Sequence, residues 1–221
     1  MAKREYGQYC GLARAAEILG QRWTILIMRD LLVEPKRYSD LAAGLPGIPS
    51  NLLSTRLKEL ENDGLIRREA RSGANRSIVY TPTERGAELV PVLDSIARWG
   101  AADMHEPREH EIVTEASLVS ALRSALQDEA PRNGSMTFTV CVGEASAHAL
   151  VSDGMVRLGS GSAENADLKI IAGPRFRDFL AGVVEPMNAE SEGAVELFGD
   201  AALLNKFAKL FQVPYTRVNS R

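Results

Sequence analysis

Short polar and cationic side chains lie on one side of an amphipathic segment that runs from Ser50 to Asp63. Leu53, Leu57 and Leu60 recur at i, i+4 and i+7, which predicts a helix with one apolar face turned to a core. The opposite side presents hydroxyl, amide and ammonium groups: Ser50, Asn51, Ser54, Thr55 and Lys58. Such groups hydrogen-bond base edges and phosphates, and the DNA major groove, about 12 Å wide, admits a helix. The segment is therefore a candidate DNA-reading helix.

Arginines are concentrated in the segment that follows. Residues 66–81 contain four Arg and one Glu, a net charge of +3. Two strand-like stretches flank a polar loop with Gly and Asn, a pattern that predicts a β-hairpin. Arg71 and Arg76 flank its tip and are candidate contacts to phosphate or to the minor groove. Taken alone, this charge also suits an ordinary solvated hairpin.

The elements around these two segments favour a DNA-binding arrangement. Besides the reading helix, four helices are expected in the first half, over residues 12–19, 23–31, 38–42 and 84–104. Arg37, at the start of the third of these, is a further candidate DNA contact. The order helix, helix, helix, hairpin is that of a winged helix-turn-helix, in which the hairpin is the wing.

Composition excludes several classes of protein. The chain has 221 residues with a formal net charge of −3, which argues against a histone-like coat of positive charge but allows a small basic face. Two cysteines exclude a disulfide scaffold and a four-cysteine zinc site. No apolar run approaches the ~20 residues of a membrane span and no signal peptide is visible, so we expect a cytoplasmic protein without membrane contact. The three His are dispersed and no catalytic constellation is visible, so we expect no metal, no cofactor and no enzyme activity.

The chain is expected to form two domains. All six Phe lie in the second half and both Trp in the first, which suggests two different cores. We expect a winged domain at 1–104, a charged linker at 105–112 and a second domain at 113–221. In the second half, helices are expected after Thr114 and over 174–184 and 201–211, and strands over 136–143, 145–151, 154–158, 167–172 and 193–198. The fold class is therefore α+β, with an antiparallel sheet covered by helices on one face.

Several fragments of the first half form a specific pattern through their order and spacing along the chain. They are Gly20-Gln21-Arg22-Trp23-Thr24, Arg37-Tyr38-Ser39-Asp40-Leu41, Leu57-Lys58-Glu59-Leu60-Glu61-Asn62-Asp63-Gly64 and Val79-Tyr80-Thr81-Pro82-Thr83-Glu84-Arg85-Gly86. Together they resemble the winged-helix transcriptional regulators of the HxlR type. The resemblance implies a homodimer on two-fold-related sites in double-stranded DNA, with half-sites about 34 Å or a multiple of that apart. The first helix and the 84–104 helix would supply the dimer contacts. The family usually has Ile-Ser-Pro where this chain has Ile48-Pro49-Ser50, so the first base-reading side chain stays open.

Cys10 falls where this family places an N-terminal cysteine, and the resemblance makes it a candidate redox sensor. Lys3 and Arg4 are near it in sequence and would favour the reactive thiolate. The alternative is a small apolar side chain buried at a dimer seam.

The second half is similar to the sterol carrier protein type 2 fold, on fragments such as Phe179-Leu180-Ala181-Gly182 and Glu196-Leu197-Phe198-Gly199-Asp200. The resemblance implies an apolar or lipid-like effector held between sheet and helices. The candidate wall residues are Phe138, Phe176, Phe179, Met187, Phe198, Phe207 and Phe211. The alternative is that these side chains only fill a core.

Three functions therefore stay open. The first is a dimeric regulator of transcription that responds to an apolar small molecule. The second keeps DNA binding but makes the second domain a dimerisation or protein-docking module. The third is a lipid carrier or lipid-modifying protein with a vestigial winged domain.

Overall fold

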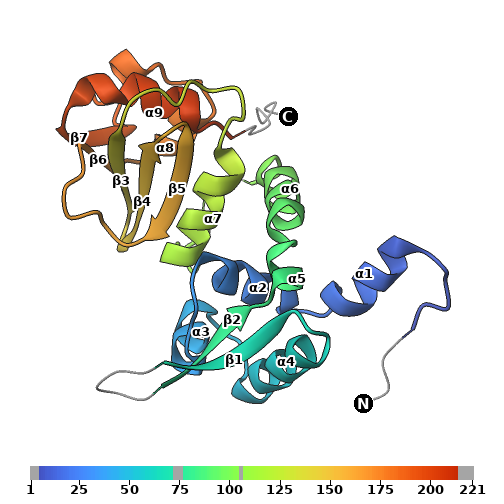
Figure 1. The fold of residues 1–221 in the computed structure, drawn as a ribbon. Helices are drawn as coiled ribbons and strands as arrows, with labels where there is room; N and C mark the ends of the chain where they lie inside the picture. Colours follow the sequence, from blue (N-terminus) through green and yellow to red (C-terminus); the bar gives the residue numbers. More distant parts are fainter. Residues whose placement is uncertain (1–4, 72–76, 105–106, 214–221) are drawn as a thin grey trace. The chain divides into compact units, whose positions relative to one another are not determined.

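A computed structural model describes residues 5–71, 77–104 and 107–213. The chain divides into two compact units, residues 1–93 and 94–221, and each is described by itself (Figure 1).

The first unit consists of short helices and a two-stranded hairpin. In chain order its elements are α1 (Gly11–Leu19), α2 (Thr24–Val33), α3 (Tyr38–Gly44), α4 (Ser50–Asn62), β1 (Ile66–Arg71), β2 (Ser77–Pro82), α5 (Glu84–Ala87) and the first residues of α6 (Val90–Ala101). This is the predicted order of a winged helix-turn-helix. The 84–104 segment, predicted as one helix, is two helices, α5 and α6.

An apolar core holds the first unit together. Leu53, Leu57 and Leu60 are at most 2% exposed, which confirms the predicted inner face of α4. They lie in one cluster of buried side chains with Ile27 and Leu31 of α2. Burial of such a face stabilises a helix more than its intrinsic propensity does. The opposite face of α4 is consequently left toward solvent.

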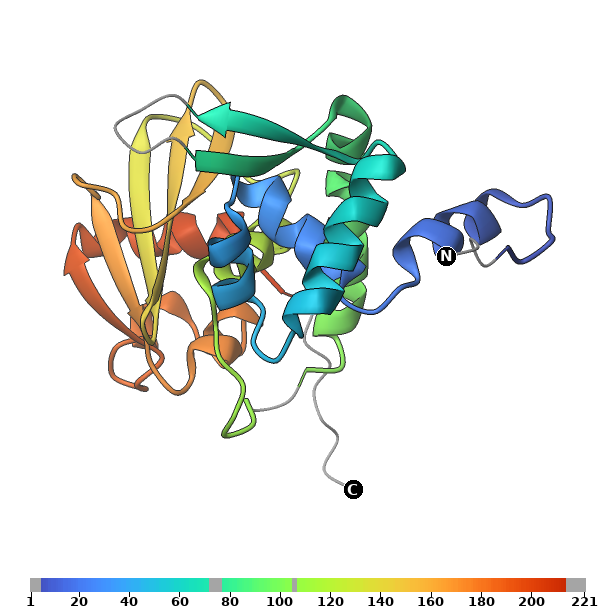
Figure 2. The ribbon, with the colours of Figure 1, turned by 90° about the horizontal axis from the view of Figure 1, so that it is seen from below.

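The hairpin is antiparallel and is fixed to the body of the unit. β1 and β2 pair from Ile66 with Pro82 to Arg71 with Ser77. On its other edge, β2 forms an isolated bridge between Tyr80 and Lys36, with N–H···O distances of 3.1 and 2.8 Å. Figures 1 and 2 both show the hairpin side by side with α4. The hairpin is therefore held to the rest of the first unit through β2.

The second unit contains one sheet and several helices. Its elements are the rest of α6, α7 (Glu115–Ala125), β3 (Met136–Val142), β4 (Ala145–Ser152), β5 (Met155–Ser160), β6 (Leu168–Ala172), α8 (Phe176–Leu180), a 3-10 turn η1 (Pro186–Asn188), β7 (Val195–Gly199), a second 3-10 turn η2 (Ala201–Leu203) and α9 (Leu204–Leu210). The strand order is β5-β4-β3-β6-β7. The predicted cap of α7 is confirmed, since Thr114 Oγ1 accepts a hydrogen bond from Ser117 N at 3.2 Å.

The prediction of an antiparallel sheet is wrong in one pair of strands. β3 and β6 pair in parallel, Phe138 opposite Leu168, while the other three pairs are antiparallel. The reason is the connection over 161–167, which leads from β5 past β4 and β3, so that β6 joins on the far side of β3. The sheet is therefore mixed. The predicted helix over 174–184 is also shorter, because α8 ends at Leu180.

Aromatic rings from the sheet and from two helices form the centre of the second unit. The ring centroids of Phe138 and Phe207 are 5.4 Å apart, those of Phe179 and Phe207 6.4 Å, and those of Phe207 and Phe211 4.8 Å. Phe138, Phe207 and Phe211 are fully buried. Edge-to-face and offset arrangements at such distances are favourable packing for aromatic rings.

Candidate nucleic-acid interface

The turn between α3 and α4 is held by one tyrosine. The hydroxyl of Tyr38 donates to the main-chain oxygen of Ser50 at 2.8 Å, and Ser54 Oγ lies 3.4 Å from the same hydroxyl. Gly47, with φ of +81°, lets the chain turn between the two helices, a conformation that glycine adopts without strain. Tyr38 was not among the predicted site residues, although its place at the start of α3 fixes the start of α4.

The predicted reading residues lie on one side of α4. Ser50, Asn51 and Lys58 are exposed, and Ser54 and Thr55 are half-buried. Thr55 Oγ1 donates to Asn51 O at 2.8 Å within the helix, and Asn51 Oδ1 accepts from Leu52 N at 2.8 Å. The Asn51 amide nitrogen and the Lys58 ammonium group are consequently the strongest donors that this face offers to a ligand.

Arg56 has a different role from the other polar residues of α4. Its guanidinium donates to Gln21 Oε1 at 3.2 Å and to Arg22 O at 3.3 Å, and it forms an ion pair with Glu59. These contacts attach the middle of α4 to the segment between α1 and α2. The sequence gives no signal for this role, since Arg56 resembles any surface arginine of a helix.

The arginines of the wing divide into paired and unpaired groups. Arg68 forms a two-pronged ion pair with Glu61, at 2.7 and 3.0 Å, and Arg67 pairs with Glu69 at 2.7 Å. Arg71 is exposed at the end of β1, and within the described part of the chain no carboxylate lies within ion-pair distance of it. Arg76 lies outside the described residues.

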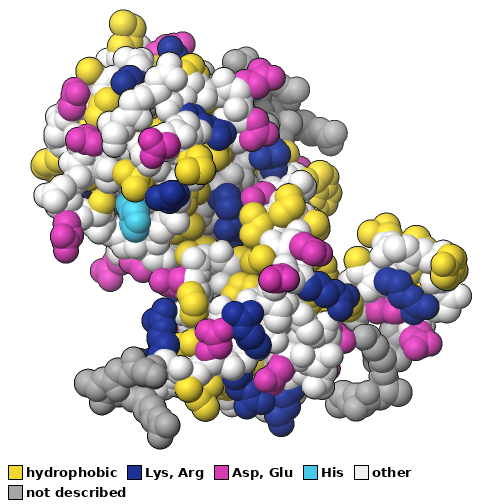
Figure 3. Space-filling model, in the orientation of Figure 1, with side chains coloured by type: hydrophobic (Ala, Val, Ile, Leu, Met, Phe, Trp, Pro, Cys, Tyr) yellow, Lys and Arg dark blue, Asp and Glu magenta, His cyan; other side chains and the backbone are white. Residues whose placement is uncertain are grey.

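Arg37 is exposed at the N-terminal end of α3, where its main-chain N–H donates to Asp40 Oδ2 at 2.9 Å. Its guanidinium has no carboxylate partner among the ion pairs of the described residues. Figure 3 shows Lys and Arg side chains gathered at the lower end of the first unit, where Figure 1 places β1 and α4, with acidic side chains interspersed. Unpaired cations at such an edge can contact phosphates.

One carboxylate of the first unit is buried. Asp30 of α2 is fully buried, and its Oδ1 accepts from Arg29 Nε at 2.7 Å. Its Oδ2 has no hydrogen-bond partner among the described residues. Burial raises the pKa of Asp30 above its usual value, although the neighbouring guanidinium of Arg29 acts in the opposite direction.

The remaining predicted site residues lie elsewhere. Cys10 is exposed and has extended backbone at the N-terminal end of α1. Of the candidate ligand-binding residues, Phe138, Phe176, Phe179, Phe207 and Phe211 are at most 8% exposed and pack on one another. Met187 and Phe198 are 86% and 50% exposed, so the structure does not bring them to this cluster.

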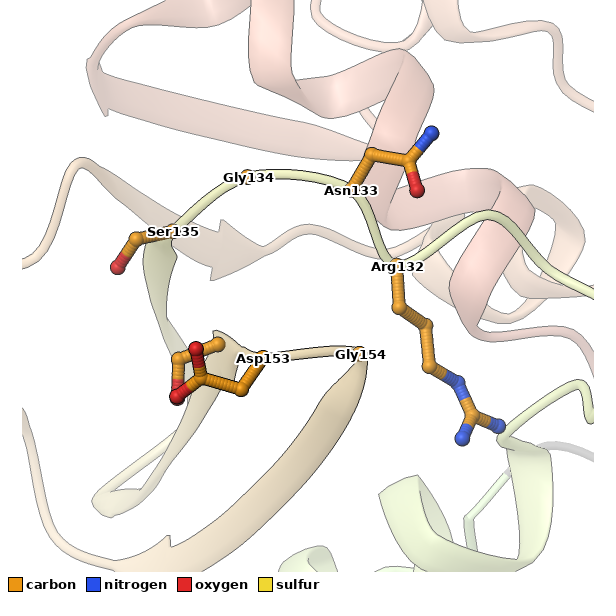
Figure 4. A pocket seen from close by; sticks show the side chains of 7 residues that line it. Arg132, Asn133, Gly134, Ser135, Asp153 and Gly154 are labelled. Atoms are coloured by element: carbon orange, nitrogen blue, oxygen red, sulfur yellow. The ribbon is translucent and has the colours of Figure 1, made fainter.

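A hollow of about 570 Å³ in the second unit lies between residues 132–135 and the turn of the β4–β5 hairpin. Its polar groups do not converge. In Figure 4 the side chains of Arg132 and Asn133 point away from Asp153, whose carboxylate extends to the opposite side. Ligand sites of small molecules have a few polar groups that converge on one position, and this hollow lacks that arrangement.

Among the described residues no group of three His, Cys, Asp or Glu side chains could hold a metal ion. No helix within the described ranges has the length and apolar character needed to cross a membrane.

The first unit thus has the fold and the exposed polar helix of a winged helix-turn-helix DNA-binding domain. Residues 18–108 match the family model described as HxlR-like helix-turn-helix. An uncharacterised HTH-type transcriptional regulator of Bacillus subtilis strain 168, YvaP, is 38% identical over 86 residues, which are 39% of this chain and 80% of the relative. The chain belongs to the HxlR family of DNA-binding transcriptional regulators.

Two further similarities concern a second regulator of the same organism. YodB of B. subtilis strain 168, an HTH-type transcriptional regulator, is 34% identical over 85 residues, 38% of this chain and 76% of the relative. The solved structure of reduced YodB aligns with 46% of this chain and with 100% of the YodB chain, at 29% identity and a TM-score of 0.39. Both similarities are to this one regulator, which is shorter than the present chain.

Proposed function

We propose that the protein is a dimeric, sequence-specific regulator that reads a two-fold-related operator with α4. The observation that carries the proposal is the exposed polar face of α4, next to a wing with an unpaired Arg71. Asn51 and Lys58 would contact bases or phosphates in the major groove, with Ser50, Ser54 and Thr55 beside them. Arg37, Arg71 and Arg76 would contact the backbone on either side.

Apolar side chains at the protein surface support the dimer. On α1, Leu12 is 78% exposed, and Tyr9 just before it is fully exposed. On α6, Trp99 is 75% and Ile96 41% exposed. Regulators of this family are typically dimeric, and exposed apolar side chains of this size are what a second copy would cover. In both views α1 extends away from the rest of the first unit (Figures 1 and 2).

The second unit is the candidate sensor of an apolar effector, with the sterol carrier likeness as its basis. The order of one helix, four strands, a short helix, a fifth strand and a closing helix supports that likeness. An apolar ligand would have to separate the rings around Phe207 in order to enter. Their close packing gives specific support to the second candidate function, in which this unit is a dimerisation or docking module. In this proposal the winged DNA-binding domain comprises residues 1–104, the linker residues 105–112 and the second domain residues 113–221.

Cys10 is a candidate redox sensor because its exposed thiol is open to oxidants. The rate of alkylation by iodoacetamide tests whether this thiol is reactive, and operator binding by the alkylated protein tests whether its modification releases DNA.

The experiment that tests the proposed function is selection of genomic fragments by the purified protein at low and at physiological salt. A two-fold-symmetric site that survives physiological salt is the expected result. If only non-specific DNA is recovered, and is lost as salt rises, DNA reading is contradicted and the lipid-carrier function becomes the better explanation.

A further inference from the structure

A second cavity lies in the second unit, where α6 meets the residues that follow α7, α8 and α9. Its volume is about 360 Å³, and its apolar wall consists of Leu126, Ala181 and Val213. Arg98 of α6 and Gln127 contribute polar groups to the same cavity. It is separate from the aromatic cluster that the sequence suggested as a ligand site, and it has the size of a small-molecule site.

Main-chain hydrogen bonds join the segments that line this cavity. Gln127 N donates to Leu210 O at 2.8 Å, Gln212 N to Ala125 O at 2.9 Å, and Val213 N to Leu180 O at 3.0 Å. Behind them, Phe211 pairs with Leu126 in an isolated bridge and packs on Phe207. The apolar wall is therefore held in place by the core of the unit and does not depend on a ligand to form it.

The charge that faces this cavity is a guanidinium in a fixed position. Arg98 Nε donates to Ser124 O at 3.0 Å, at the end of α7. This bond uses Nε and does not use the two Nη groups. No carboxylate of the described residues forms an ion pair with Arg98. Asp128 also borders the cavity, but its side chain is fully exposed and lies 4.0 Å from Arg132.

Nearby contacts hold the stem of Arg98. One turn earlier on α6, Asp94 forms a 2.7 Å ion pair with Arg123 of α7, and both side chains are less than 20% exposed. α6 and α7 are thus joined at two successive turns. A guanidinium held at its Nε is preorganised for an anion, because less side-chain freedom is lost when the ligand binds.

We propose that this cavity binds a small amphipathic carboxylate, with the carboxylate on the Nη groups of Arg98 and the apolar part against Leu126, Ala181 and Val213. A planar carboxylate matches two parallel N–H donors of one guanidinium. The amide nitrogen of Gln127 is already used, since it donates to Ala125 O at 2.8 Å and Gln212 O at 3.1 Å. Specificity for the anion therefore depends on Arg98.

The test is calorimetric titration of the full-length protein with octanoate and with octanol, which has the same chain without the charge. Octanoate is expected to bind at least about tenfold more tightly than octanol, and Arg98→Gln is expected to abolish that preference. Arg157→Gln is the matched control, because Arg157 is an exposed arginine of β5 outside the cavity. Ala181→Leu, which fills the cavity without a change of charge, is expected to weaken both ligands.

Three results would overturn this site: no octanoate binding up to about 10 mM, equal affinity for octanol, or an unchanged titration in Ala181→Leu. If Arg98→Gln fails to fold, as judged by circular dichroism, the octanol comparison and Ala181→Leu still decide the question. The titrations contain no DNA, so their failure leaves the proposed DNA reading intact.

Discussion

The hydroxyl of Tyr38 donates to the main-chain oxygen of Ser50 at 2.8 Å, and so ties the first residue of α3 to the first residue of α4. This bond fixes the end of the helix that is proposed to enter the DNA groove. A small displacement there changes the position of every side chain on the reading face.

Tyr38→Phe removes this bond and keeps the ring. We expect a loss of about 0.5–1.5 kcal/mol in the free energy of unfolding, the usual net value of one hydrogen bond, together with weaker operator binding. Urea denaturation and fluorescence anisotropy with a labelled operator measure the two effects. Full operator affinity in Tyr38→Phe would show that the bond does not position α4.

The two faces of α4 should respond differently to truncation. Asn51→Ala removes an exposed amide and is expected to change operator preference while leaving stability within about 0.5 kcal/mol. Leu57→Ala, at a side chain 2% exposed, is expected to cost about 2–5 kcal/mol of stability through the cavity it leaves. Binding selection on randomised DNA and thermal unfolding distinguish the two. Unaltered preference in Asn51→Ala would assign base reading to another residue.

Thr55→Ala is expected to have a weaker effect on operator preference than Asn51→Ala. The reason is that the Thr55 hydroxyl already donates to Asn51 O at 2.8 Å. An equal or larger change would mean that the hydroxyl turns to the DNA in the complex.

Unpaired and paired wing arginines should differ in the salt dependence of binding. Arg71→Gln is expected to reduce the slope of log affinity against log salt by about one per lost phosphate contact. Arg68→Gln is the matched control, because Arg68 is already held by Glu61 in a two-pronged ion pair. Anisotropy titrations at several salt concentrations give both slopes. A slope that changes equally in both variants would contradict a specific role for Arg71.

Much of the first unit could be predicted because its signals are local. The spacing of Leu53, Leu57 and Leu60 gives the inner face of α4, and the hairpin follows from its loop composition. Pro91 was a signal that could have divided the 84–104 helix, since proline has no N–H for an interior helical bond and suits the first turn of a new helix.

Other features are decided by tertiary contacts that a single sequence does not show. Alternation along a strand tells which side chains share a face but not the direction of its neighbour, so the parallel pairing of β3 with β6 could not be predicted. The anchoring of Arg56 on Gln21 and Arg22 joins residues more than thirty positions apart. The same holds for the cavity beside Arg98, which forms only where α6 meets the segments that follow α7, α8 and α9.

Asp30 should give the stability of the first unit a pH dependence of predictable sign. Burial raises the pKa of Asp30 in the folded state above its usual value near 3.8, so the folded state holds the proton more tightly than the unfolded state. The corresponding stability is fully present below 3.8 and is lost as pH rises through the raised pKa. Relative to Asp30→Asn, whose side chain does not titrate, the native protein is therefore expected to lose free energy of unfolding over that interval.

The measurement is urea denaturation of the native protein and Asp30→Asn at successive pH values, with Glu61→Gln as a contrast of opposite sign. The hydrogen bond from Arg68 lowers the pKa of Glu61, so the stability that Glu61 contributes is lost as pH falls. A difference between native protein and Asp30→Asn that is constant with pH would show that Asp30 has the same pKa folded and unfolded. In that case the ion pair with Arg29 would fully offset the burial of the carboxylate.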